Sequence, residues 1–262
     1  METIDISYLL LGVFYAILVI PILISLKLGL KNIRNIVISV VRMTVQLGLV
    51  GLYLEVIFRL NKWWLNLIWI LVMLLAASGT VVRNAGLKAR YFLPVSIAGL
   101  TIGIFGTGVI LLGVVVRPQP PWDAAYVIPI MGMLLGNCMR GNILALERFY
   151  SSVTKREREY VTYLSMGASF REATAPFLRE AMTPALAPTL STMATLGIVS
   201  LPGMMTGQIL GGSPPMIAIK YQIAIMIAIF TAIVVSIVVT LLLSMRIAFN
   251  KYRTLKKSII WK

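Results

Sequence analysis

The sequence predicts an all-α fold, a bundle of helices that crosses a membrane several times. Of its 262 residues 59% are hydrophobic and 13% are charged, and the mean hydropathy is +0.91. A soluble domain cannot bury so large an apolar fraction. The apolar runs also have the length of about 20 residues that a helix needs to span a bilayer. They lack the alternation of apolar and polar residues that is typical of strands in a membrane barrel.

Seven stretches have the length and composition of a membrane-spanning helix. They cover residues 8–26, 36–58, 63–82, 93–116, 124–146, 182–201 and 216–245. No Gly/Ser-rich linker, low-complexity tract or internal repeat separates them, so residues 1–262 are expected to form a single membrane domain. Two glycine pairs with a spacing of four residues predict close helix packing, either in the bundle or at a dimer seam, Gly99 with Gly103 and Gly132 with Gly136.

The distribution of basic residues predicts the orientation of the chain. Most of the 24 lysines and arginines follow the first, third, fifth or seventh stretch. The opposite flanks carry only Arg59, Lys62, Arg117 and Lys220. The positive-inside rule then places the N-terminus outside and the C-terminus in the cytoplasm of a multi-pass protein of the plasma or inner membrane. We attribute the net charge of +15 to contact with anionic membrane lipid and not with nucleic acid.

Residues 147–180 form a polar and basic segment in an otherwise apolar chain. It contains two capping-box patterns, Thr154 with Glu157 and Ser169 with Glu172. They predict a short cytoplasmic helix, a tight corner at Gly167 and a second helix that returns to the membrane, because glycine closes helices at low cost. Such a rigid corner could couple the membrane helices to a soluble partner. An ordinary interfacial helix without a partner is the alternative.

Residues 201–215 form a segment rich in glycine, proline and methionine on the predicted outer side. Its prolines and glycines predict a break on both sides of a short middle piece. At membrane depth such a segment must face protein or a water-filled cavity. Its polar and thioether side chains could contact a transported solute, namely Met204, Met205, Thr206 and Gln208. A packed turn in which the methionines only fill space is the alternative.

Two arginines lie inside predicted spans, each with an amide side chain on the same helical face. The pairs are Arg42 with Gln46 and Asn137 with Arg140. Both arginines lie about 9 Å from the predicted cytoplasmic ends, which suggests one ring along a substrate pathway. A charge near the bilayer centre costs at least about 2.5 kcal/mol and usually faces a cavity. A positive inner mouth would favour anionic solutes or chelated metal over a bare cation, whereas snorkelling to the headgroups would leave both arginines outside the pathway.

Several activities are disfavoured by what the sequence lacks. Histidine is absent and Cys138 is the single cysteine, so an intrachain disulfide is excluded and no metal ligands can be named. No phosphate-binding loop pattern is present, so any ATP hydrolysis must occur on another chain. No nucleophile with a base and no pair of intramembrane carboxylates is visible. We therefore expect a transport protein and not an enzyme.

Three strings in the sequence resemble the FetB-type ABC transporter permease family, which also includes plant aluminium-sensitivity membrane proteins. They are LSMGASFREA at residues 164–173, VSLPGMMTGQILGG at 199–212 and IKYQ at 219–222. The resemblance covers nearly the whole chain and implies a homodimeric permease that works with two copies of a cytosolic ATP-binding subunit. It further implies that ATP and magnesium bind to that subunit and that this chain holds no cofactor. Bacterial members are linked to iron export, and plant relatives are linked to nucleotide-sugar transport.

The resemblance also suggests which residues couple the permease to the ATP-binding subunit. Other ABC permeases carry a Glu-Ala-Ala triplet before a glycine, whereas this chain has Val161-Thr162-Tyr163 before Gly167. The expected coupling residues are Tyr160, Leu164, Gly167, Ala168, Ser169 and Glu172. Export of iron or another metal is the expected function. The alternatives are a permease for a nucleotide sugar or another anionic solute, and a secondary transporter that needs no ATP-binding subunit.

Overall fold

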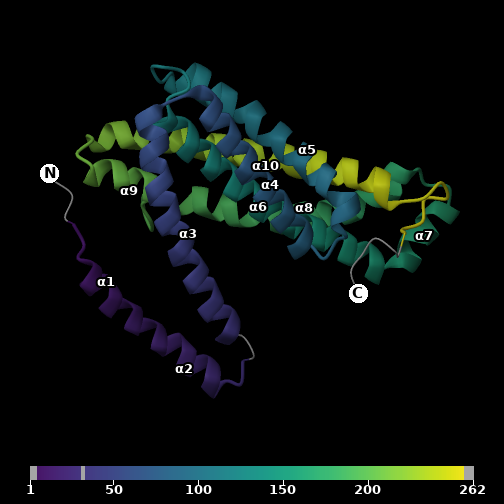
Figure 1. Cartoon of the computed structure of the whole chain (residues 1–262). Helices are drawn as coiled ribbons and strands as arrows, with labels where there is room; N and C mark the ends of the chain where they lie inside the picture. The colour runs from purple at the N-terminus through teal and green to yellow at the C-terminus, as the bar shows by residue number, and fades with distance from the viewer. Residues whose placement is uncertain (1–4, 31–32, 257–262) are drawn as a thin grey trace.

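The computed structural model describes residues 5–30 and 33–256, and the helices in them are arranged as Figure 1 shows. In chain order they are α1 (Tyr8–Phe14), η1 (Tyr15–Leu18), α2 (Val19–Lys27), α3 (Ile33–Leu60), α4 (Trp63–Asn84), α5 (Ala89–Ile110), η2 (Leu111–Val116), α6 (Ala124–Lys155), α7 (Glu157–Ser165), α8 (Phe170–Thr195), α9 (Gly203–Leu210) and α10 (Pro215–Ala248). These residues form no β-strand, and bridge residues occur only at isolated positions. The predicted all-α fold is therefore confirmed.

Six helical segments of the described chain are long and apolar enough to cross a membrane. They are Tyr8–Lys27, Ile33–Leu60, Trp63–Asn84, Ala89–Val116, Ala124–Lys155 and Pro215–Ala248. The other expected span, residues 182–201, falls partly in α8, whose 26 residues begin in the polar segment and end at Thr195. Charged residues in the first half of α8 lower its hydropathy. The number of spans and their orientation thus stay predictions.

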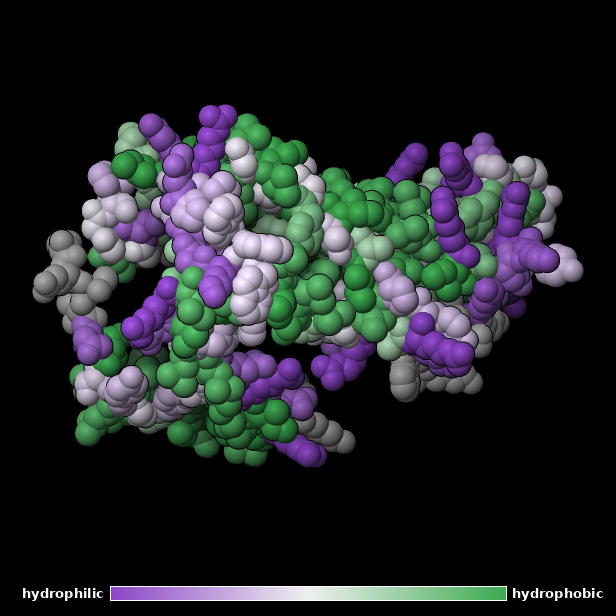
Figure 2. All heavy atoms as spheres, turned by 45° about the horizontal axis from the view of Figure 1, so that its top comes forward, coloured by the Kyte–Doolittle hydropathy of each residue, from purple (hydrophilic) through white to green (hydrophobic). Residues whose placement is uncertain are grey.

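Helices α4, α5, α6, α8 and α10 pack into one bundle, with α10 against both α5 and α6. Figure 2 shows a hydrophobic band along this bundle and hydrophilic residues gathered at its two ends. One end holds α7 and the start of α8, and the other holds α9 and the turn between η2 and α6 (Figure 1). This distribution is typical of a protein whose middle lies in lipid.

Small residues bring α5 and α10 into close contact. A Cβ added to Gly99 would lie 1.9 Å from Thr240 Oγ1, and one added to Gly103 would lie 2.6 Å from Ser236 Cβ. The first predicted glycine pair is thus confirmed. At the second pair a Cβ at Gly132 would meet only a methionine sulfur at 3.7 Å and one at Gly136 would meet nothing within 4 Å, so a role within the bundle is not observed and a role at a dimer seam stays a prediction.

The N-terminal helices form an arm that diverges from the bundle (Figure 1). Helix α3 meets the bundle near its C-terminal end, where Tyr53 lies over Trp69 with ring centroids 3.9 Å apart and Ile57 packs near Ala124 and Ile128. No residue in the most apolar 18-residue stretch of α3 is buried. The arm therefore exposes an apolar surface that only lipid or another protein can cover.

Substitution of Gly103 tests the contact between α5 and α10. A Cβ at this position would also lie 2.8 Å from the Ala232 carbonyl oxygen, which cannot move without moving α10. We expect Gly103→Ala to lower the free energy of unfolding by about 1–3 kcal/mol, measured by thermal unfolding in detergent. The matched control is Gly106→Ala on the same helix, where a Cβ meets nothing within 4 Å. Equal stability of the two variants would contradict the proposed contact.

Candidate functional site

The polar segment folds as a helix, a corner and a second helix. Helix α7 ends at Ser165, and Gly167 has a φ of +90°, a left-handed conformation that suits glycine. The Ser169 N–H donates to Glu172 Oε2 at 2.7 Å, and the Glu172 N–H donates to Ser169 Oγ at 3.3 Å. This capping box confirms the predicted start of α8. The Ser169 hydrogen bonds hold the pKa of the Glu172 carboxyl below its usual value.

The first predicted capping box does not form. Thr154 lies in the last turn of α6, and the residue that precedes α7 is Arg156, whose side chain does not cap the helix. Phe149 and Val153 are buried in the bundle, so tertiary packing extends α6 past the local signal. The Arg156 guanidinium instead bonds to Glu180 on α8 and lies 4.8 Å from the centre of the Phe177 ring.

Tyr160 attaches α7 to the end of α10. Its side chain is 1% exposed, and its ring centroid lies 5.6 Å from that of Phe249 and 6.2 Å from that of Phe177. The phenol donates to the Arg253 carbonyl oxygen at 2.6 Å. Burial raises the pKa of Tyr160 to about 12. A partner could not contact this side chain directly, so its place in the structure favours an anchoring role that the sequence did not indicate.

The remaining predicted coupling residues lie at the surface of the corner. Gly167, Ser169 and Glu172 are exposed, while Leu164 and Ala168 are partly buried against the bundle. The neighbouring Met166 is 80% exposed, although nothing in the sequence pattern singled it out. Arg158 on α7 and Arg171 on α8 are exposed as well, so this end offers a partner an apolar side chain together with basic ones.

A cavity of about 510 Å³ lies between α6, α8, α9 and α10. Three predicted pathway residues line it together, Asn137 and Arg140 from α6 and Met204 from α9. An Arg140 Nη atom donates to Asn137 Oδ1 at 3.1 Å, which orients both side chains on one wall. The volume of this cavity is within the range of about 300–1,000 Å³ that is typical of small-molecule sites.

The cavity also contains Gln222, which the pathway prediction missed. This α10 residue is 5% exposed, and its Oε1 atom has no hydrogen-bond partner among the described residues. A buried acceptor without a partner favours binding of a donor from water or a solute. Its place in an apolar helix, at the end of the 219–222 string, was a signal that could have identified it.

The other residues of the 201–215 segment have different surroundings. Its middle piece is the short helix α9, as the sequence predicted. Met205 is buried and lines an adjacent cavity of about 500 Å³, which shares Gln222 with the first cavity. The Thr206 hydroxyl donates to the Pro202 carbonyl at 3.1 Å, whereas Gln208 Oε1 is buried without a partner among the described residues.

Arg42 and Gln46 do not lie in the cavity that contains Arg140. They line a cavity of about 740 Å³ between α3 and α4, together with Tyr53 and Trp69. The arm meets a different side of the bundle, so one chain does not form the expected ring of two arginines. Their role in a pathway stays a prediction that depends on what covers α3.

No conventional metal centre forms in the described part of the chain. It contains no group of three or more His, Cys, Asp or Glu side chains that could hold a metal ion. Cys138 is fully buried in α6.

The Tyr160 anchor predicts a measurable change in the C-terminal segment. Loss of the hydrogen bond in Tyr160→Phe should destabilise the protein by about 1 kcal/mol and accelerate trypsin cleavage after Lys251 and Arg253. The neutral phenol is the donor, so in the wild type the bond is complete below pH ~10 and is lost as the pH rises through about 12. Tyr163→Phe is the control, because Tyr163 donates only to Glu159 within α7. Equal cleavage of both variants would contradict the anchor.

Comparison with known proteins places the chain in one family. The model of the uncharacterised protein family UPF0014 matches residues 8–249. The membrane protein YjkA of Bacillus subtilis is 36% identical over 77% of this chain and 78% of its own length. The probable iron export permease protein FetB of Escherichia coli is 34% identical over 80% and 79%, and the protein ALUMINUM SENSITIVE 3 of Arabidopsis thaliana is 32% identical over 80% and 76%. No solved structure matches the chain. The chain is therefore a membrane protein of the UPF0014 family.

Proposed function

We propose that this chain is the permease subunit of an ABC transporter that exports iron or another metal. The observation that carries the proposal is the exposed corner at residues 166–172, which is joined rigidly to the helices that line the cavity. The likeness to a relative named as a probable iron export permease supports it. A cytosolic subunit would bind ATP and magnesium, and two copies of it would act on a homodimer of this chain.

Movement of the corner can reach the cavity by two routes. Helix α8 begins at the capping box and contributes Ala185, Thr189 and Thr192 to the cavity wall. Pro184 directly precedes Ala185 and Pro188 directly precedes Thr189, and each removes one backbone hydrogen bond of the helix. The helix can therefore bend near the cavity, and Pro176 is a further bending point in its cytoplasmic half.

The second route runs through α7 and the C-terminal segment. Tyr160 bonds to the Arg253 carbonyl, and Phe249 lies between Tyr160 and Phe170 with ring centroids 5.6 and 5.1 Å away. Helix α10 ends at this cluster and carries Gln222 into the cavity. A force on the corner would thus act on two opposite walls of the cavity at once.

The charge of the cavity favours an anionic cargo. Among its lining residues Arg140 is the charged one, and no carboxylate accompanies it. A bare divalent cation would be repelled there, whereas a metal in an anionic chelate would be attracted. The same arrangement supports the second candidate, a permease for a nucleotide sugar or another anionic solute.

Substitution of Gly167 tests the corner. Valine is strained at a φ of +90°, so Gly167→Val should separate ATP hydrolysis from transport in proteoliposomes that contain the ATP-binding subunit. Asparagine tolerates this conformation, and Gly167→Asn should retain most of the coupling. Full transport by Gly167→Val would remove the corner from the mechanism. Vigorous transport without any ATP-binding subunit would instead favour a secondary transporter.

Substitution of Arg140 tests the cavity. Loss of a charge-assisted hydrogen bond to the cargo should reduce transport by Arg140→Gln about tenfold or more, with binding of the ATP-binding subunit unchanged. Arg148→Gln provides the control, because Arg148 lies on the same helix and pairs only with Glu147 at 3.5 Å. An unaltered rate in Arg140→Gln would show that this arginine snorkels to the headgroups.

A further inference from the structure

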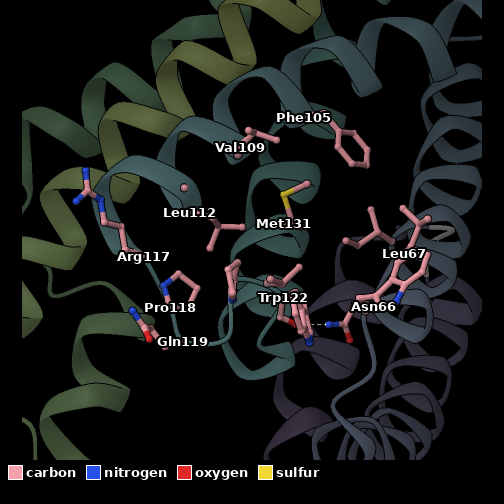
Figure 3. A pocket seen from close by; sticks show the side chains of 16 residues that line it. Asn66, Leu67, Phe105, Val109, Leu112, Arg117, Pro118, Gln119, Trp122 and Met131 are labelled. Carbon is pink, nitrogen blue, oxygen red and sulfur yellow. Dashed lines mark hydrogen bonds between the residues drawn. The ribbon is translucent and has the colours of Figure 1, made fainter.

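A separate groove of about 670 Å³ lies at the end of the bundle opposite the corner. It is formed by α4, the end of α5 with η2, and the start of α6, as Figure 3 shows. Its walls are apolar and include Leu67, Ile70, Phe105, Val109 and Met131. None of its lining residues belongs to the Arg140 cavity.

The groove opens toward the sides of the helices. Val109 is 63% exposed and Leu67 is 46% exposed, although both belong to membrane-spanning helices. Trp63 and Trp122 are exposed at its rim, and tryptophans of this kind mark the boundary between hydrocarbon and headgroups. A ligand in the groove would therefore have its apolar part at the depth of acyl chains and its polar part at the depth of headgroups.

The polar rim combines a cation with a buried acceptor. Arg117 Nε donates to the Val114 carbonyl at 2.9 Å, and no carboxylate of the described residues lies within ion-pair distance of its guanidinium. Asn66 is 3% exposed, and its Nδ2 donates to the Trp122 carbonyl at 2.6 Å. Its Oδ1 has no hydrogen-bond partner among the described residues. Figure 3 shows Arg117 and Asn66 on two sides of the groove, with Leu112 and Met131 between them.

We propose that this groove is a binding site for an anionic phospholipid with a hydroxylated headgroup. The acyl chain lies along the apolar wall, the phosphate pairs with Arg117, and a headgroup hydroxyl donates to Asn66 Oδ1. The lateral opening and the apolar walls favour a lipid over a water-soluble solute, because most of the groove lies at the depth of acyl chains. A bound lipid would also add to the hydrogen bonds of Asn66 and Asn61 that hold the turn at residues 122–124 beside α4.

Two substitutions should block the site. Gly113 lines the groove, and a Cβ there meets nothing within 4 Å, so the side chain of Gly113→Phe can leave the backbone freely and take up lipid space. Arg117→Asn removes the charge, and asparagine tolerates the left-handed backbone of this position, whose φ is 50°. The matched controls lie outside the groove, namely Gly106→Phe, which is equally open, and Lys220→Gln, which removes another basic residue near the same end.

Native mass spectrometry of the purified chain measures the result. With phosphatidylglycerol, Arg117→Asn should retain about fivefold less lipid than the wild type, the effect of one basic residue near a membrane surface. Gly113→Phe should also retain less lipid than the wild type, because its ring occupies the space of the acyl chain. The two controls should bind as the wild type does. The wild type should also retain phosphatidylglycerol over phosphatidylcholine.

Several outcomes would overturn the proposal. Equal retention of phosphatidylglycerol by Gly113→Phe and the wild type would show that the lipid binds elsewhere. Equal retention of phosphatidylcholine and phosphatidylglycerol would exclude an anionic site. Thermal stabilisation by soluble glycerol phosphate alone would assign the groove to a water-soluble phosphate compound. These measurements need neither an ATP-binding subunit nor transport, so they are independent of the proposed function.

Discussion

The close approach of α10 to its neighbours is the contact on which the rest of the structure depends. Gly99 and Gly103 on α5 receive Thr240 and Ser236, and Gly141 on α6 lies against Ile233. Without a hydrophobic force between helices in lipid, such close backbone contacts are a principal source of association. Helix α10 carries Gln222 in the cavity, and at its end Phe249 contacts Tyr160 of the corner. The close packing of α10 therefore fixes the position of the cavity relative to the corner.

This arrangement gives the cavity and the corner a mechanical connection. The capping box at Ser169 keeps the start of α8 rigid, and the cluster around Tyr160 keeps the end of α10 beside it. Rigid ends combined with proline positions near the cavity concentrate bending where a solute would sit. In the function proposed above, the positive wall at Arg140 and the acceptor at Gln222 would select the solute.

Patterns with a local physical cause could be predicted from the sequence. The helical class followed from composition, and the corner followed from Gly167 and the capping box at Ser169. The capping signal at Thr154 was overridden because Phe149 and Val153 bury their side chains and prolong α6. The buried surroundings of Tyr160 and Gln222 could not be predicted, because they depend on contacts between residues distant in the chain. The separation of Arg42 from Arg140 had the same cause, since depth in the membrane does not specify which side of a bundle a helix occupies.

The burial of Cys138 has a practical consequence for spectroscopy. This is the single cysteine of the chain, and its thiol is fully buried within α6. Water-soluble maleimide labels react with accessible thiolates, so the native protein should be almost inert to them. Pairs of fluorophores or spin labels could therefore be attached at chosen surface positions on α7 and α10 without altering the natural background, and distances between these helices could be followed through a transport cycle.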